Sequence, residues 1–360
     1  MNKIKLFDPV IGINEKRSII KVLESKFWAS GSGSGNVLKF EENFRKYIDS
    51  DGCVAVNSGT AALNLSLSLI DVKNYEVILP SLSFVSTANA IILNGGKPVF
   101  VDVDPNTLNI DPGKIENSIS SKTKIILPVH FGGLPSNLEK IHSLSKKYNL
   151  KIVEDAAHAA GSRYKNKKIG THSLAVCFSF HPIKNLAMPT GGLISINDTN
   201  HKKIRDILSA KRWCGITNRK GTNYDVKQVG NNYYMNEFSA AIGLVQLKKL
   251  DKLNNIHRKI AKRYSHEIEL HTKMQFDKNC SYHLYWILVK NRNKFRKKMS
   301  ECGIETGTHY KPIHTFSLYK SKIKLKNTEN IGKSIVTIPC HSNLKEDDIE
   351  KIIQLTNKFS

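Results

Sequence analysis

The strongest constraint on the fold is a regular alternation of short apolar runs with amphipathic segments between about residue 50 and residue 200. Runs such as "EVILP", "KIVEDAA" and "LAVCFSF" have the length and β-branched composition of buried strands. Segments such as "GTAALNLSLSLI" and "NLEKIHSLSKKY" between them carry apolar residues at helical spacing. Strands and helices in this order predict an α/β fold in which a mainly parallel sheet is flanked by helices.

The rest of the chain predicts a second, smaller domain. At 360 residues the chain exceeds the size at which one hydrophobic core stops growing. Residues 236–268 predict one long helix, and "HLYWILV", "KFRKKMSEC" and "KEDDIEKIIQLTNKF" after it predict a strand and two helices. We therefore expect a large domain at residues 1–250 and a small C-terminal α+β domain at residues 251–360.

Charge and cysteine usage limit the possible partners. The formal charge is +24, but its lysines are dispersed in pairs such as Lys146-Lys147, so we expect a solvated surface that attracts small anions and no nucleic-acid partner. The six cysteines form no C-x-x-C pair, which favours reduced core thiols and no metal site. Without a signal-like N-terminus or a long apolar stretch, the chain is expected to be cytoplasmic and to bind no membrane.

The stretch "SGSGSGN" at residues 30–36 leaves two alternatives open. Its composition is typical of a flexible linker. Its short length and its position between "FW" and "VLKFEENF" equally favour a glycine-rich surface loop near a site.

Two residues after predicted strands could carry chemistry. Lys184 follows "LAVCFSF" in a segment with no other fixed charge, and a poorly solvated lysine amine can attack a carbonyl to form a Schiff base. Asp155 ends the strand in "KIVEDAA", at the sheet edge where ligands bind, and could pair with a protonated ring nitrogen of pyridoxal phosphate. Taken alone, Lys184 could be a surface lysine and Asp155 a helix cap or a salt-bridged acid.

Two further segments complete a candidate site. In "NSGTAAL" a helix begins at Gly59 and Thr60, where unpaired backbone N–H groups and the helix dipole would bind a phosphate. Phe84 in "PSLSFVST" could stack on a planar ring. Each feature has a common structural explanation, a helix cap or a core residue. Together, however, they predict the four parts of a pyridoxal phosphate site.

With these motifs the chain resembles the DegT/DnrJ-type sugar aminotransferases, within the aspartate-aminotransferase fold class of pyridoxal phosphate enzymes. The resemblance extends from "FDPVIG" to "IPCHSNLKEDDIEKII" and includes "NSGTAALNL", "VEDAAHAAG" and "FSFHPIKN". It implies that Lys184 binds the cofactor covalently and that Asp155 contacts the pyridinium nitrogen. The other positions that it implies for the cofactor are Gly59, Thr60, Phe84, His158, Ser179 and Asn232. The positions that it implies for the sugar substrate are Trp28, His309, Tyr310 and His314.

The resemblance also implies a reaction and an assembly. An amino group would pass from L-glutamate to a keto sugar, at C4 rather than C3, of a nucleoside diphosphate-linked deoxysugar. The active sites would be shared in a homodimer, with Asn232 reaching the neighbour's phosphate. Tyr234 stands where the family commonly has arginine, and "AMPTGG" differs from the usual stretch after the lysine, so these positions do not identify the substrate.

Two other functions stay open at this stage. A pyridoxal phosphate-dependent sugar dehydratase of this family would replace the lysine with histidine or add an iron–sulfur cluster, whereas Lys184 is present and the cysteines are scattered. A non-catalytic binding or regulatory protein of the same fold would have no need of the cofactor residues, yet each residue type is present.

Overall fold

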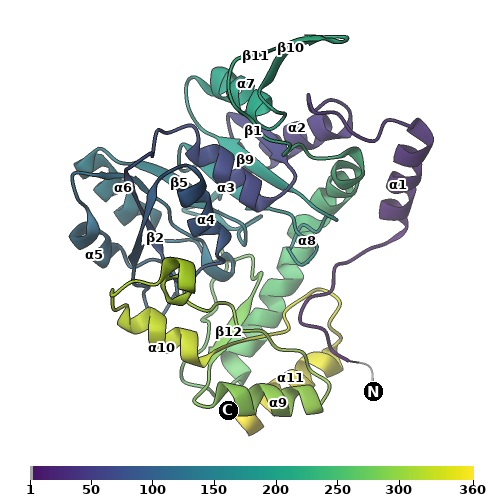
Figure 1. The fold of residues 1–360 in the computed structure, drawn as a ribbon. Coiled ribbons are helices and arrows are strands. Elements are labelled where there is room, and N and C mark those ends of the chain that lie inside the picture. The colour runs from purple at the N-terminus through teal and green to yellow at the C-terminus, as the bar shows by residue number, and fades with distance from the viewer. Residues whose placement is uncertain (1–2) are drawn as a thin grey trace.

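The computed structural model describes residues 3–360 and has a seven-stranded sheet at its centre (Figure 1). The strand order is β1-β9-β8-β5-β4-β2-β3. The strands of this sheet are β1 (Gly52–Val56), β2 (Glu76–Pro80), β3 (Lys97–Val101), β4 (Thr123–Ile126), β5 (Lys151–Asp155), β8 (Ala175–Ser179) and β9 (Gly192–Ile196).

The pairing of the strands is mainly parallel. β3, β2, β4, β5 and β8 are parallel neighbours, whereas β9 is antiparallel to both β8 and β1. Two reversals around β9 leave β1 pointing the same way as β8, so the carboxyl ends of β1, β2, β4, β5 and β8 share one edge. The predicted α/β class is confirmed, and this edge is where such sheets bind ligands.

Helices cover both faces of the sheet (Figure 1). One face packs against α3, α4 and α7, and the other against α2, α5, α6 and the first part of α8. The bounds of the covering helices are α2 (Asn36–Ile48), α3 (Gly59–Leu67), α4 (Ser86–Leu93), α5 (Pro112–Ile115), α6 (Leu138–Tyr148), α7 (His201–Lys211) and α8 (Glu237–Glu267).

The alternation of side chains along β5 places two neighbouring acids on opposite faces. Val153 packs in the cluster beneath α3 and α4, and Ile152 packs in the cluster beneath α6. Because side chains alternate along a strand, Asp155 shares the face of Val153 and Glu154 shares that of Ile152. Glu154 there accepts a hydrogen bond from the buried ring of His130 at 2.8 Å, which leaves Asp155 as the acid on the α3 side.

The C-terminal part of the chain is built on the end of α8, which runs from the sheet toward α9 and α11 (Figure 1). α8 has 31 residues and confirms the predicted long helix. Its last turns join β12, β13 and the terminal helices in one core cluster. The predicted boundary at residue 250 falls within α8, and the division into two domains stays a prediction. The bounds of these elements are β12 (Tyr285–Leu288), α9 (Arg292–Glu301), α10 (Lys326–Ser334), β13 (Ile335–Ile338) and α11 (Glu346–Phe359).

Smaller elements complete the fold. Helix α1 packs along α8, and two hairpins and four 3-10 turns lie in the connections. Their bounds are α1 (Ile13–Ser25), β6 (Arg163–Tyr164), β7 (Lys167–Lys168), β10 (Ile216–Lys220), β11 (Asn223–Val226), η1 (Glu116–Ser118), η2 (Phe131–Gly133), η3 (Ile313–Thr315) and η4 (Ser317–Tyr319).

The glycine-rich stretch at residues 30–36 is a packed surface loop. Gly31 lies against the Trp213 ring and Gly33 against the Arg212 guanidinium, so closely that an added Cβ would overlap each of them. Arg212 Nη2 also donates a hydrogen bond to the Ser32 carbonyl at 3.0 Å. These contacts exclude the flexible linker, and the loop is not part of the cavity described below.

The cysteines agree with the expected reduced thiols. Cys53, Cys177, Cys280 and Cys340 are buried, Cys302 is half-buried and Cys214 is exposed, and all six are free. Within residues 3–360 there is no helix with the length and apolarity needed to span a bilayer.

Candidate active site

A cavity of about 310 Å³ lies at the carboxyl edge of the sheet. Ligand pockets typically begin near about 300 Å³, so the volume suits a small cofactor. The cavity lies among the segments that follow β1, β2, β4, β5 and β8, together with one segment of the C-terminal part. Its lining includes Ser58, Gly59, Thr60, Ser83, Phe84, Asp155, His158, Ser179, Lys184, His309 and Tyr310.

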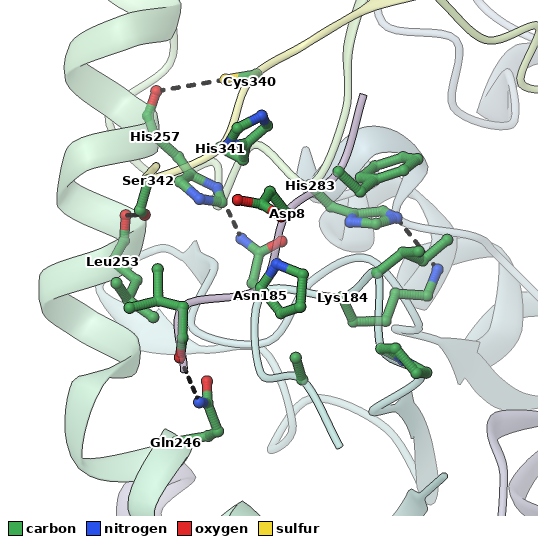
Figure 2. A pocket seen from close by; sticks show the side chains of 16 residues that line it. Asp8, Lys184, Asn185, Gln246, Leu253, His257, His283, Cys340, His341 and Ser342 are labelled. Carbon is green, nitrogen blue, oxygen red and sulfur yellow. Dashed lines mark hydrogen bonds between the residues drawn. The ribbon is translucent and has the colours of Figure 1, made fainter. Parts of the chain in front are cut away.

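Lys184 projects into this cavity from the turn after β8. Its backbone N–H donates to the His181 carbonyl at 2.8 Å, which fixes the turn. Its Nζ lies 3.2 Å from Nε2 of His283 (Figure 2). Burial lowers the pKa of Lys184 to about 7, against a smaller opposing effect of Asp155. Near neutral pH a substantial fraction of the amine is therefore neutral and nucleophilic.

Asp155 lies on the same cavity, buried beneath α4. One carboxylate oxygen accepts a hydrogen bond from Thr87 Oγ1 at 2.8 Å, and the other accepts from the Ala157 N–H at 3.1 Å. Burial raises the pKa of Asp155, although these hydrogen bonds oppose it. Among residues 3–360, no cationic side chain lies within 4 Å of this carboxylate. It is therefore placed to pair with a cation that the chain does not supply.

His158 and Tyr310 form a hydrogen-bonded pair beside Asp155. The Gly132 N–H donates to His158 Nδ1 at 3.2 Å, so the ring proton lies on Nε2, which contacts the Tyr310 hydroxyl at 3.1 Å. Burial and the nearby Lys184 keep the pKa of His158 well below its usual value. Burial and Asp155 raise the pKa of Tyr310. Both groups are consequently neutral hydrogen-bonding partners for a ligand.

The first turn of α3 forms an end of the cavity that is suited to bind an anion. Ser58 caps the helix by accepting a hydrogen bond from the Ala61 N–H at 3.1 Å. The remaining N–H groups of the first turn are free to bind an anion. Gly59 packs against Ser179, and an added Cβ there would lie 2.7 Å from the serine Cβ. The close approach brings the Ser179 hydroxyl and the helix start to one place, as a phosphate requires.

Phe84 lies at the cavity with one side uncovered. Its ring centroid is 6.0 Å from that of Tyr310, and the residue is 55% exposed. A buried core aromatic would have no such free surface, so Phe84 can cover a planar ring.

His309 also lines the cavity, but three predicted residues do not. His309 bonds Thr337 Oγ1 at 2.8 Å through Nδ1, and burial lowers its pKa to about 4. Trp28 is 53% exposed and packs against Phe238. Asn232 is exposed, and its carbonyl accepts from the Asn57 side chain at 3.3 Å. His314 is buried, bonded to Ser81 at 2.6 Å, and lines a separate hollow.

Several residues of the site were not predicted from the sequence. Thr87 and Ser83 form a hydrogen-bonded chain to Asp155, with 2.7 Å between their hydroxyl oxygens. His283 lies at the start of the apolar run "HLYWILV", 99 residues from Lys184. A polar residue at the start of a buried strand was the only available signal for His283.

The arrangement fits pyridoxal 5'-phosphate. The α3 start and Ser179 would hold its phosphate, Asp155 its ring nitrogen, Phe84 one ring face and Lys184 its aldehyde carbon. No cluster of three or more metal-ligating side chains occurs in the described part of the chain.

Comparisons with known proteins agree with this chemistry. SpsC, a spore coat polysaccharide biosynthesis protein of Bacillus subtilis, is 34% identical over 369 residues, covering 96% of this chain and 94% of SpsC. The structure of Helicobacter pylori PseC, an aminotransferase of pseudoaminic acid biosynthesis, matches with a TM-score of 0.93 and 29% identity over 99% of both chains. Spr1654 of Streptococcus pneumoniae, solved in its PLP form, matches with a TM-score of 0.92 and 25% identity, covering 99% of this chain and 98% of Spr1654.

The match extends to a whole family. Residues 9–356 fit the model of the DegT/DnrJ/EryC1/StrS aminotransferase family, which is nearly the entire chain. The chain therefore belongs to the DegT/DnrJ/EryC1/StrS aminotransferases and is an enzyme whose cofactor is pyridoxal 5'-phosphate.

Proposed function

We propose that this enzyme transfers an amino group from L-glutamate to the C4 keto carbon of a deoxysugar linked to a nucleoside diphosphate. The observation that carries the proposal is the juxtaposition of a lysine of depressed pKa and a buried carboxylate on one cavity. The lysine supplies a nucleophile and a proton carrier, and the carboxylate stabilises positive charge on a ring nitrogen.

The bound cofactor supplies an electron sink for the pair left when a C–H bond next to nitrogen breaks. The chain's residues supply the rest. Asp155 would hold the ring nitrogen in its protonated form, and the hydrogen bonds from Thr87 and Ala157 fix the orientation of the Asp155 carboxylate. Lys184 Nζ, once released from the cofactor by the amino donor, accepts the α-proton of glutamate and returns a proton in the second half of the reaction.

The relatives support a sugar as the amino acceptor. SpsC takes part in spore coat polysaccharide biosynthesis and PseC in pseudoaminic acid biosynthesis. His309 and Tyr310 line the cavity and would contact the sugar, while Trp28 stays a predicted contact outside it.

The charge of the chain supports an anionic carrier on the sugar. A second hollow of about 490 Å³ begins at Lys311, directly after Tyr310, and also contains Arg292, Lys320 and Lys333. His314 lines this hollow, so its predicted role would be at the nucleotide rather than at the sugar. Clustered cations next to the cavity would attract a diphosphate, as would the overall charge of +24.

We also propose a homodimer with shared active sites. Asn232 is exposed and does not line its own cavity, as expected of a residue that reaches a partner's phosphate. The surface of helix α1 exposes Ile13, Ile20 and Leu23, which could be covered by a second copy.

The dehydratase alternative gains no support. Lys184 occupies the position where the cofactor would be bound, and the six free cysteines are not grouped into an iron–sulfur ligand set.

The test is a half-reaction followed by product analysis. Purified enzyme loaded with pyridoxal phosphate should show the visible band of a lysine-linked cofactor, which L-glutamate bleaches. Keto sugar nucleotides added next should restore the band, and NMR of the product would locate the new amine. A band that glutamate leaves unchanged would contradict amino transfer from glutamate, and nitrogen at C3 would contradict the C4 assignment.

A further inference from the structure

His283 contacts the reacting nitrogen of Lys184. The two residues belong to distant parts of the chain, since Lys184 follows β8 and His283 precedes β12. His283 Nε2 and Lys184 Nζ are 3.2 Å apart, which is hydrogen-bond distance for an amine and an imidazole. Figure 2 shows one ring nitrogen of His283 directed at the Lys184 amine.

A small second cavity lies behind this pair. Its volume is about 30 Å³, enough for a water molecule, which needs roughly 10–15 Å³. Asp8, Asn185, His257, His283 and His341 contribute polar atoms to its wall. The side chain of Asp8 is 31% exposed, so the cavity extends from the buried His283 ring to a residue in contact with solvent.

In the apo-enzyme a proton must leave Lys184 before the amine can attack the cofactor. Over residues 3–360, no carboxylate lies within 4 Å of Lys184 Nζ to act as the base. The imidazole of His283 is the basic group in contact with it.

We propose that His283 is the proton acceptor of Lys184 and passes the proton to water in the cavity beside Asp8. Nε2 takes a proton from the Lys184 ammonium, leaving a neutral amine and an imidazolium. The imidazolium then releases its Nδ1 proton to water, and the ring is neutral again in its other tautomer. A rotation of the His283 ring, or a return of protons to the ring through the same water, restores the starting tautomer.

The surroundings keep His283 in the accepting form. Burial, Lys184 and the neighbouring rings of His158, His309 and His257 hold the pKa of His283 well below its usual value. The His158 ring lies 4.5 Å away and Phe7 stacks on His283 at 5.4 Å.

Other ionisable groups face the pair but make no contact with Nζ within hydrogen-bond distance. Asp155 and Tyr310 belong to the main cavity, and Asp8 and His341 to the small one. Between about pH 6 and about pH 9, His283 therefore stays neutral while Lys184 loses its proton, since the pKa of Lys184 is lowered to about 7. The relay matters below that pKa and becomes unnecessary above it.

The inference rests on the proposed role of Lys184, but it does not depend on the identity of the sugar. The test measures the rate at which the apo-enzyme forms its covalent link to pyridoxal phosphate. Stopped-flow absorbance records this rate as the growth of the visible band, from about pH 6 to about pH 9. His283→Ala should slow this step by about a hundredfold below pH 7 and converge with the wild type at the alkaline end. His283→Gln, which can still hydrogen-bond to Lys184 but cannot carry a proton, should be as slow as His283→Ala at low pH.

Chemical rescue separates proton transfer from positioning. Free imidazole should restore the rate of His283→Ala, whereas thiazole, similar in shape but far less basic, should not. His172→Gln is the matched control, because the half-buried His172 packs against Tyr164 and lines neither cavity, and it should stay within about twofold of the wild type.

Three results would overturn the proposal: an unchanged rate, a defect of equal size at every pH, or full recovery with His283→Gln. Equal alkaline rates for both His283 variants would show that they are folded. A wild-type enzyme that never develops the band would instead contradict the role of Lys184 itself.

Discussion

Two regions of this molecule bury charged side chains and use them in opposite ways. Near the glycine-rich loop, Arg212 is 1% exposed and forms an ion pair with Glu41, while its guanidinium also donates to the carbonyls of Ala55 and Ser32. In the main cavity, Asp155 is buried and Lys184 is half-buried, but the two form no ion pair with each other.

The difference distinguishes a structural ion pair from charged residues that are available for chemistry. A paired buried ion holds segments together, as Arg212 holds the loop against β1. Buried ions without a partner have shifted pKa values and are available to a ligand, as for Lys184 and Asp155. Burying Lys184 and Asp155 without an ion pair costs free energy of folding. A bound cofactor that contacts both residues would offset this cost.

The largest effect is expected for Lys184→Met. Without the amine, covalent binding of the cofactor and proton transfer are both lost, so amino transfer should fall by about 10⁴-fold or more. Single-turnover absorbance with L-glutamate measures this loss of amino transfer. A variant that retains more than a hundredth of the activity would contradict the role of Lys184.

The same variant should stabilise the apo-protein. In the folded state the pKa of Lys184 lies near 7, below its usual value of 10.5, so the unfolded chain binds the proton more tightly. The wild type therefore gains stability as pH rises from 7 toward 10.5, and the advantage of Lys184→Met should be greatest at low pH. Urea unfolding of both apo-proteins at several pH values tests this, and a pH-independent difference would contradict it.

Arg212→Met should have the opposite consequence. It leaves the buried carboxylate of Glu41 without its cation, which is expected to lower the free energy of unfolding by about 3–5 kcal/mol. Urea denaturation measures this loss. Partial recovery of stability in the double variant Arg212→Met/Glu41→Gln would assign the cost to the unpaired carboxylate. A loss of unfolding free energy below about 1 kcal/mol would contradict a structural role for this ion pair.

Asp155→Asn should reduce catalysis while leaving the fold intact. An amide cannot hold a proton on the ring nitrogen electrostatically, so the glutamate half-reaction should slow by about a hundredfold or more. The Thr87 hydroxyl can still donate to the amide oxygen, so the melting temperature should change little. The visible band of the linked cofactor should persist, and its loss would mean that Asp155 is needed for binding rather than for reactivity.

Thr87→Val is expected to give the smallest effect. It removes one hydrogen bond to a charged acceptor in a residue of similar shape, a change worth roughly 1.5–3 kcal/mol. The half-reaction should therefore slow by about tenfold or somewhat more. Ser66→Ala, which removes a buried hydroxyl near Cys177 instead, is the control and should leave the rate unchanged.

Local patterns were enough to predict the fold class and the position of Asp155 and Lys184 at one edge of the sheet. The period-2 pattern of "KIVEDAA" puts Asp155 at a strand end on one face, and the alternation of strand and helix brings it to the edge shared with Lys184. The position of Asp155 on its strand follows from local backbone geometry, and its closeness to Lys184 follows from the parallel direction of the strands.

Residues that depend on packing between distant segments were not predictable. His283 meets Lys184 only because the C-terminal part folds back along α8, and Thr87 meets Asp155 across 68 residues. The sequence around "SGSGSGN" suggested flexibility equally well, because the rings and charges that hold the loop, Trp213 and Arg212, lie far along the chain. No single-sequence pattern encodes such contacts.

The proposed chemistry depends on one bond, between Lys184 and the cofactor. Reduction of the loaded enzyme with borohydride makes such a bond permanent, and peptide mass spectrometry then locates it among the many lysines. We predict a single modified peptide, carrying the pyridoxyl group on Lys184, and none in the Lys184→Met variant. Modification of another lysine, or of surface lysines in general with Lys184 unmodified, would contradict the account.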